Sequence, residues 1–136
     1  MLILVNFLYN NFKGGDRVVV EKRKYKRVKF DCEILYPTVI YNNEKRLFSD
    51  NCKLYAVDIS EAGIALKSNF FIPKDAFITF FLRIEDYLPF RALVKVRWNK
   101  NSNGYFFCGG EFIALNLEDI HKIRTYITKH INDMEV

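Results

Sequence analysis

The stretch FRALVKVRW, residues 90–98, decides the fold class, because apolar and basic side chains alternate along it. One face carries the apolar set Phe90, Ala92, Val94, Val96 and Trp98, and the other face carries Arg91, Lys95 and Arg97. A period of two residues is typical of a half-buried β-strand. We therefore expect a strand here, then a polar hairpin tip at residues 99–104 and a returning strand at residues 105–114. Gly109-Gly110 in the returning strand predicts a bulge or a close backbone approach.

The same period appears at residues 28–36, where one face carries Val28, Phe30, Cys32, Ile34 and Tyr36 until Pro37 interrupts. Asn42-Asn43-Glu44-Lys45 is typical of a turn. Further strands are expected from about residue 53 to 60, at residues 64–67 and at residues 76–84, with a loop at 69–75 that contains Pro73.

The period changes to that of a helix after residue 115. Asn116 can cap a helix whose first turn carries Glu118 and Asp119, which favour the positive end of the helix dipole. The apolar residues then form a helical stripe, namely Leu117, Ile120, Ile123, Ile127 and Ile131. Six or seven short strands followed by one helix predict a mainly β fold, a small antiparallel barrel with a helix closing one side.

The chain of 136 residues is long enough for one domain with one core. Half of its residues are hydrophobic, which excludes disorder, and 13 Phe with 8 Tyr favour β-structure over a helical bundle. The formal charge of +5 is uneven, because six cations lie within residues 22–29 and only Glu21 opposes them. Such a segment implies an anionic partner, unless it is a solvated basic flank.

Cys32, Cys52 and Cys108 are odd in number and have no CxxC spacing. We interpret them as small buried apolar residues in a reducing cytosol, not as a disulfide frame or a zinc site. Residues 1–20 form an N-terminal flank that begins with an apolar run, too short for a membrane span. We expect an extra strand or a partner-binding segment there, with the barrel domain at residues 21–136.

Two short segments carry the chemistry. Arg23 and Arg27 lie four apart in the basic run EKRKYKRVKF, and each guanidinium can bind phosphate oxygens or the O6/N7 pair of guanine bidentately. Asp58-Ile59-Ser60-Glu61-Ala62-Gly63 supplies a carboxylate, a hydroxyl and a glycine at a predicted strand-to-strand turn. Asp58 can accept from the N1–H and exocyclic amine of guanine, so the two segments together suit a ligand with phosphates and guanines.

These segments resemble the RxxxR and (D/N)xSxxG motifs of PilZ domains, the bacterial receptors for the second messenger cyclic di-GMP. The resemblance covers roughly residues 21–131. It implies a six-stranded barrel with a C-terminal helix, and a flexible arm at Arg23 and Arg27 that wraps over the ligand. It also implies a stand-alone cytoplasmic receptor that signals when the ligand orders the arm and that acts through an unidentified protein effector in trans.

The predicted ligand residues are therefore Arg23, Arg27, Asp58, Ser60 and Gly63, with Lys22, Tyr25 and Trp98 as auxiliary candidates. In a strand, Asp58 and Ser60 project to the same face. Gly63 is expected to have positive φ or to let a ligand approach the backbone. The alternative is an ordinary hairpin turn, in which Ser60 and Asp58 bond the amides of the turn itself. Trp98 is either core packing or an aromatic surface for the ligand.

No enzyme motif or cofactor motif is present, and His121 and His130 are nine apart, a spacing that does not suit metal ligation. A different class of function is a small basic barrel that binds single-stranded nucleic acid, although Asp58 has no role in it and makes it less favoured. A ligand-independent protein adaptor is the third alternative. The sequence leaves open the oligomeric state, the number of ligand molecules and the downstream process.

Overall fold

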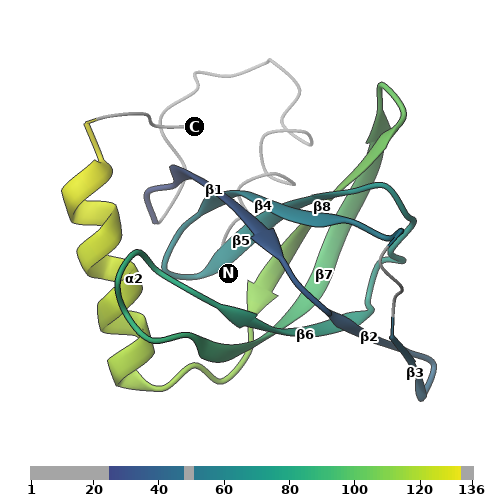
Figure 1. Ribbon diagram of the computed structural model, residues 1–136, viewed down its shortest axis with the longest axis horizontal. Helices are drawn as coiled ribbons and strands as arrows, with labels where there is room; N and C mark the ends of the chain where they lie inside the picture. The colour runs from purple at the N-terminus through teal and green to yellow at the C-terminus, as the bar shows by residue number, and fades with distance from the viewer. Residues whose placement is uncertain (1–24, 48–50, 133–136) are drawn as a thin grey trace, which may run out of the picture.

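The computed structural model describes residues 25–47 and 51–132, which form eight β-strands and the helix α2 (Figure 1). The strands are β1 (Val28–Ile34), β2 (Thr38–Tyr41), β3 (Glu44–Leu47), β4 (Leu54–Ile59), β5 (Gly63–Ser68), β6 (Phe77–Leu82), β7 (Phe90–Ser102) and β8 (Tyr105–Phe112). The helix α2 covers Leu117–His130.

The strands form one antiparallel sheet in the order β1-β4-β5-β8-β7-β6-β2-β3. The mainly β antiparallel fold is therefore confirmed, but with eight strands in place of six. The first predicted strand ends at Ile34 as β1, because Tyr36 has φ 53° and Pro37 follows it. Beyond Pro37 the chain forms β2, which was not predicted. β1 pairs with β4 and β2 pairs with β6, so this stretch of chain connects the two ends of the strand order.

β3 was not predicted either. Asn42 and Asn43 both have positive φ, 53° and 66°, and Tyr41 pairs with Glu44 across them. Asparagine tolerates this conformation, and a two-residue turn of this kind matches the twist of a hairpin. The turn therefore uses only two residues, and Glu44 and Lys45 belong to β3.

A two-residue turn also makes the hairpin of β7 and β8 longer than predicted. Asn103 and Gly104 have φ of 51° and 84°, and Ser102 pairs with Tyr105. The expected polar tip at residues 99–104 is therefore only two residues long. Figure 1 shows this hairpin projecting beyond the rest of the barrel.

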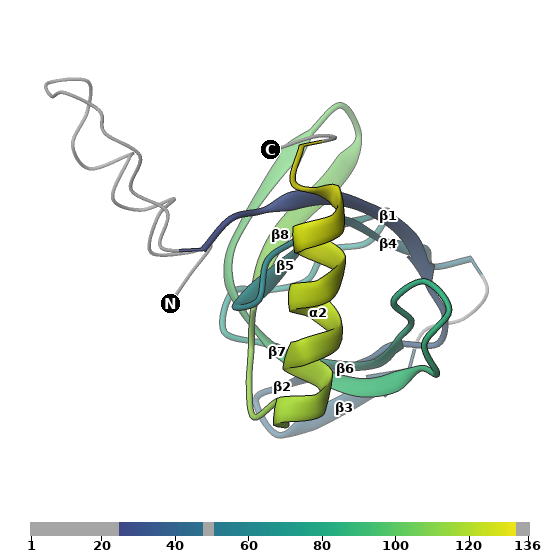
Figure 2. The ribbon, with the colours of Figure 1, turned by 90° about the vertical axis from the view of Figure 1, so that its left-hand side faces the viewer.

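Alternating strand residues fill the barrel, and α2 covers one of its ends (Figure 2). Asn116 caps the helix through its Oδ1, which accepts from the amide of Asp119 at 2.8 Å, as predicted. Ile123 and Ile127 are buried against the core, but Leu117 is 81% exposed, so its place in the predicted stripe is wrong. The first turn of α2 is held by its cap, and apolar contact begins only in the next turn.

Candidate functional site

Of the predicted arm, the structure describes only the residues from 25 onwards, and these lead into β1 beside the predicted turn. Lys22 and Arg23 lie outside the described residues, whereas Arg27 directly precedes β1 and has a buried Nε. Val28 pairs with Ile59, and Lys29 pairs with Asp58. The base of the arm therefore runs antiparallel to the end of β4, next to the predicted turn.

Asp58 lies on the outer side of this pair of strands. Val28 and Ile59 are fully buried in the core, so the neighbouring residues Arg27 and Asp58 project to the other face. A bulge between Ala56 and Asp58 in the pairing with β5 makes this possible, because it shifts the alternation of β4 by one residue. Asp58 is only 6% exposed, and its Oδ1 is buried.

Ser60 organises the turn itself. Its Oγ accepts from the amides of Ala62 at 3.2 Å and Gly63 at 3.1 Å, and its own amide donates to the carbonyl of Gly63 at 2.9 Å. The side chain is fully buried. These contacts agree with the ordinary hairpin interpretation of Ser60.

Gly63 does not have positive φ, so that part of the prediction is wrong. Among the glycines in the described residues, Gly104 is the one with this conformation. Gly63 instead begins β5 and pairs with Glu111 on β8. Because the Ser60 hydroxyl already satisfies two amides, the turn closes without a left-handed residue at its end.

A transverse row of residues continues from Asp58 across three further strands. Asp58 pairs with Ala65, Ala65 with Gly109, and Gly109 with Trp98. Paired residues share a face of a sheet, so Asp58 and Trp98 flank two of the smallest side chains in the protein. We call this surface, Asp58 with Ala65, Gly109 and Trp98, the outer row.

The indole of Trp98 lies directly against Gly109. A Cβ built at Gly109 would stand 2.9 Å from Cζ2 of Trp98 and closer still to Nε1. The close backbone approach predicted for Gly109-Gly110 is thus confirmed, and Trp98 is the side chain that approaches. Trp98 is half-buried and does not belong to the cluster of buried core residues, so the core-packing alternative for it is wrong.

A cavity of about 360 Å³ joins the arm to the turn. Tyr25 lines it from the arm, and Glu61 and Ala62 line it from the turn. Arg124 on α2 is a fourth wall, and its Nε donates to Oε1 of Glu61 at 2.8 Å. The predicted auxiliary residue Tyr25 is therefore placed at the site, together with a helix residue that the sequence did not indicate.

The charges around this cavity are arranged in pairs. Arg97 at the bulge of β7 forms an ion pair with Glu111, which also lines the cavity. Further along the outer face, Lys67 lies 4.2 Å above the ring of Tyr105. Sequence reasoning could not have found Glu61–Arg124 or Arg97–Glu111, because 63 and 14 residues separate the partners.

Neither histidine and none of the cysteines lines the cavity at the turn. His130 Nε2 is 2.9 Å from Glu85, and this contact is the main reason why the pKa of Glu85 is lowered. All three thiols are free, but only Cys108 is buried, whereas Cys32 and Cys52 are half-buried, contrary to the prediction. In the described ranges, no cluster of three His, Cys, Asp or Glu side chains is arranged to hold a metal ion.

The helix content also bears on the predicted absence of a membrane span. Across residues 25–47 and 51–132, none of the helical structure combines the length and hydropathy that a bilayer-crossing helix needs.

The fold defines a class, small domains with a mainly antiparallel β-sheet and one C-terminal helix. A family model of the PilZ domain matches residues 21–129, and the chain belongs to this family.

Two solved structures show the same fold. The inhibitor of motility MotI/DgrA of Bacillus subtilis has a TM-score of 0.60 at 15% identity, over 84% of this chain and 54% of that one. MrkH of K. pneumonia, in a complex with c-di-GMP, has a TM-score of 0.54 at 19% identity, over 85% and 55%. The chain thus spans about half the length of these proteins. No curated protein matches it.

Proposed function

We propose that this protein is a non-catalytic cytoplasmic receptor that binds cyclic di-GMP between its N-terminal arm and the outer row. The observation that carries the proposal is the register Lys29–Asp58, which sets the base of the arm beside the acidic residue of the turn. Membership of the PilZ family supports it, as does the c-di-GMP complex of MrkH, a protein of the same fold.

Each predicted ligand residue has a distinct role in this proposal. Arg23 and Arg27 bind phosphates or the O6/N7 edges of guanine, and Asp58 accepts from the N1–H and amine of a guanine. Ser60 keeps the turn in shape through its two amide hydrogen bonds, and so acts on the ligand indirectly. Gly63 at the start of β5 is buried, and its amide and its carbonyl both bond Ser60, so it also acts on the ligand through the shape of the turn.

The auxiliary residues complete the site. Trp98 contacts the ligand with the edge or face of its indole. The ring fits against Gly109 because Gly109 has no side chain. Tyr25 stacks on a base or anchors the arm at the cavity shared with Glu61. Lys22 adds long-range attraction to the phosphates.

The signal arises because the ligand holds the arm against the barrel. The arm leads directly into β1, where the hydroxyl of Tyr126 on α2 donates to the carbonyl of Lys29 at 3.1 Å. A protein effector in trans would then recognise the ordered arm together with this surface.

Calorimetry tests the proposal. The unmodified chain should bind cyclic di-GMP with micromolar affinity or better and should discriminate against cyclic di-AMP. Arg27→Ala and Asp58→Ala should each weaken binding by about 1–3 kcal/mol, the range of a good bidentate guanine contact. Asp31→Ala is the matched control, because this carboxylate is 69% exposed and pairs only loosely with Lys29 at 3.9 Å.

Unchanged affinity in Asp58→Ala, with the fold intact by circular dichroism, would contradict the proposal. Steeply salt-dependent binding of a single-stranded oligonucleotide, without affinity for the dinucleotide, would support the nucleic-acid alternative instead.

A further inference from the structure

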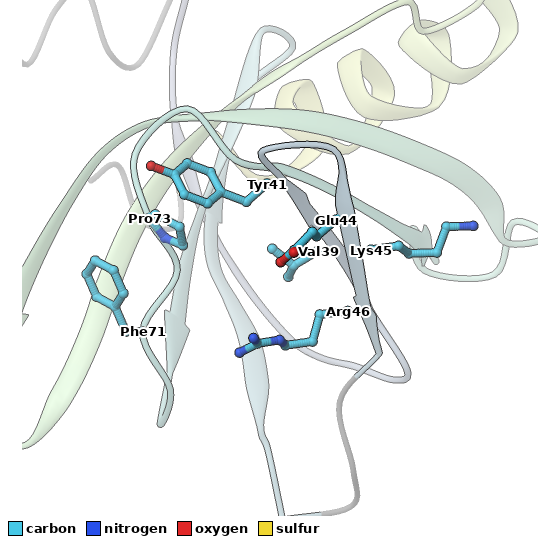
Figure 3. A pocket seen from close by; sticks show the side chains of 7 residues that line it. All are labelled: Val39, Tyr41, Glu44, Lys45, Arg46, Phe71 and Pro73. Carbon is cyan, nitrogen blue, oxygen red and sulfur yellow. The ribbon is translucent and has the colours of Figure 1, made fainter.

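A second cavity, of about 500 Å³, shares no lining residue with the cavity at the turn (Figure 3). It lies at the hairpin of β2 and β3, which Figure 1 shows on the side of the sheet away from α2. The hairpin of β2 and β3 forms one wall, with Tyr41, Glu44 and Arg46. The loop between β5 and β6 forms the other wall, with Phe71 and Pro73. Figure 3 shows Tyr41 close to Pro73, and Arg46 extending towards the side of Phe71.

The hairpin that carries this cavity is an edge of the sheet. β3 is the last strand in the sheet order, and among the described residues it pairs with β2 alone. The backbone N–H and C=O groups on the far side of an edge strand are a template for another strand. Val39 pairs with Arg46 and Tyr41 with Glu44, so these four side chains share the face of the hairpin that lines the cavity.

The walls of the cavity expose aromatic surface that is held in position. Phe71 is 57% exposed and Tyr41 is 42% exposed. Phe71 packs edge-on against Phe106, with 5.8 Å between the ring centroids. Aromatic side chains that are fixed beside a cavity are typical anchors of protein interfaces.

The charges of β3 favour an acidic occupant. Lys45 and Arg46 outnumber Glu44, all three are exposed, and in the described part of the chain none of them forms an ion pair. Basic side chains on an edge strand ordinarily protect it from aggregation. That role does not explain an aromatic-walled cavity along the same edge.

We propose that β3 and this cavity bind an extended acidic segment of a partner protein, which joins the sheet as a further strand. The main chain of the segment pairs with β3, one apolar side chain enters between Tyr41 and Phe71, and flanking carboxylates face Lys45 and Arg46. Because side chains alternate along a strand, acidic residues next to and two positions from the apolar residue reach the two cations. A nucleic acid has no main chain that can pair with β3, so the edge strand favours a peptide.

The experiment starts with selection of a library of random decapeptides displayed on phage against the full chain without cyclic dinucleotide. The selected peptides should be rich in Asp and Glu around one apolar or aromatic residue. Synthetic copies, followed by fluorescence anisotropy, should bind Arg46→Glu and Tyr41→Ala at least tenfold more weakly. Hydrogen exchange of the amides of Glu44–Leu47 should slow in the complex.

Arg91→Glu is the matched control, because Arg91 is an exposed cation on β7 outside this cavity. It should bind the peptides as the unmodified chain does. The proposal is overturned if the peptides bind Arg46→Glu and Tyr41→Ala with unchanged affinity, or if no peptide is enriched over selection against Tyr41→Ala. It is also overturned if a single-stranded dT oligonucleotide binds instead and shows the same dependence on both substitutions.

Discussion

The indole of Trp98 occupies the space that a side chain at Gly109 would need. Cζ2 of Trp98 lies 2.9 Å from the position of a Cβ on Gly109, closer than folded proteins allow. Two strands with a bulge between Val96 and Trp98 create this contact. Gly109 also belongs to the outer row with Asp58. The position of the indole against Gly109 is therefore part of the shape of that surface.

Gly109→Ala should therefore displace the indole. The change should cost about 1–3 kcal/mol of unfolding free energy, as overpacking does, and should shift the fluorescence emission of the protein, since Trp98 is its only Trp. Chemical denaturation monitored by fluorescence and circular dichroism measures both effects. In Gly109→Ala with Trp98→Ala, the added cost of the alanine should disappear. Unchanged emission in the single variant would contradict the geometry.

Ser60→Ala should reduce stability more than a substitution at an exposed turn position would, because Ser60 is fully buried. The substitution leaves the amides of Ala62 and Gly63 without the buried acceptor, at a cost of about 1–3 kcal/mol. Urea denaturation gives the value. A loss of cyclic di-GMP affinity with no loss of stability would instead mean that Ser60 contacts the ligand directly.

The contact between Arg124 and Glu61 should contribute little to stability. Arg124 is 59% exposed, and exposed ion pairs are worth about 0.2–1 kcal/mol. A double-mutant cycle with Glu61→Gln and Arg124→Gln should give a coupling in that range. The same cycle on cyclic di-GMP affinity reports whether the ligand senses α2, because both residues line the cavity at the arm. Identical affinities in all four proteins would show that it does not.

Cys108 should resist alkylation in the folded protein. Burial raises the pKa of its thiol to about 12, well above the usual value of about 8.5, so little of the reactive thiolate forms at pH 8. Mass spectrometry after iodoacetamide treatment should find label at Cys52 and not at Cys108, until denaturant is added. Label at Cys108 at the rate of a denatured thiol would contradict its burial.

The raised pKa also gives the direction of a pH effect. The unfolded thiol releases its proton at lower pH than the folded one, so Cys108 contributes stability that is complete below about pH 8.5. This contribution is lost as the pH rises towards about 12. Cys108→Ala should therefore make the fall in unfolding free energy between these values less steep.

Most of the strands could be predicted from the sequence because their burial follows a period of two. The alternation at residues 90–98 appears in the structure as buried and half-buried positions of β7. The hairpin of β2 and β3 could not be predicted, because β3 begins with the three charged residues Glu44, Lys45 and Arg46 and shows no apolar alternation. The exposure of Leu117 could not be predicted either, because an apolar stripe does not show which of its residues contact the strands.

The candidate site was predictable only in part. The motif segments identified Asp58 and Ser60, and the structure assigns Ser60 to the turn. The outer row depends on two bulges, between Ala56 and Asp58 and between Val96 and Trp98, which a strict period of two does not contain. Trp98 and Gly109 were each noticed in the sequence, but only the register of β7 and β8 brings them together.

The bend at Leu35–Pro37 has a consequence for the order of assembly. β1 finds its partner β4 within the first sixty residues, whereas β2 must wait for β6, beyond residue 76. Nearby partners meet sooner than distant ones. We therefore expect the strand that follows the basic segment to pair with β4 before β2 pairs with β6.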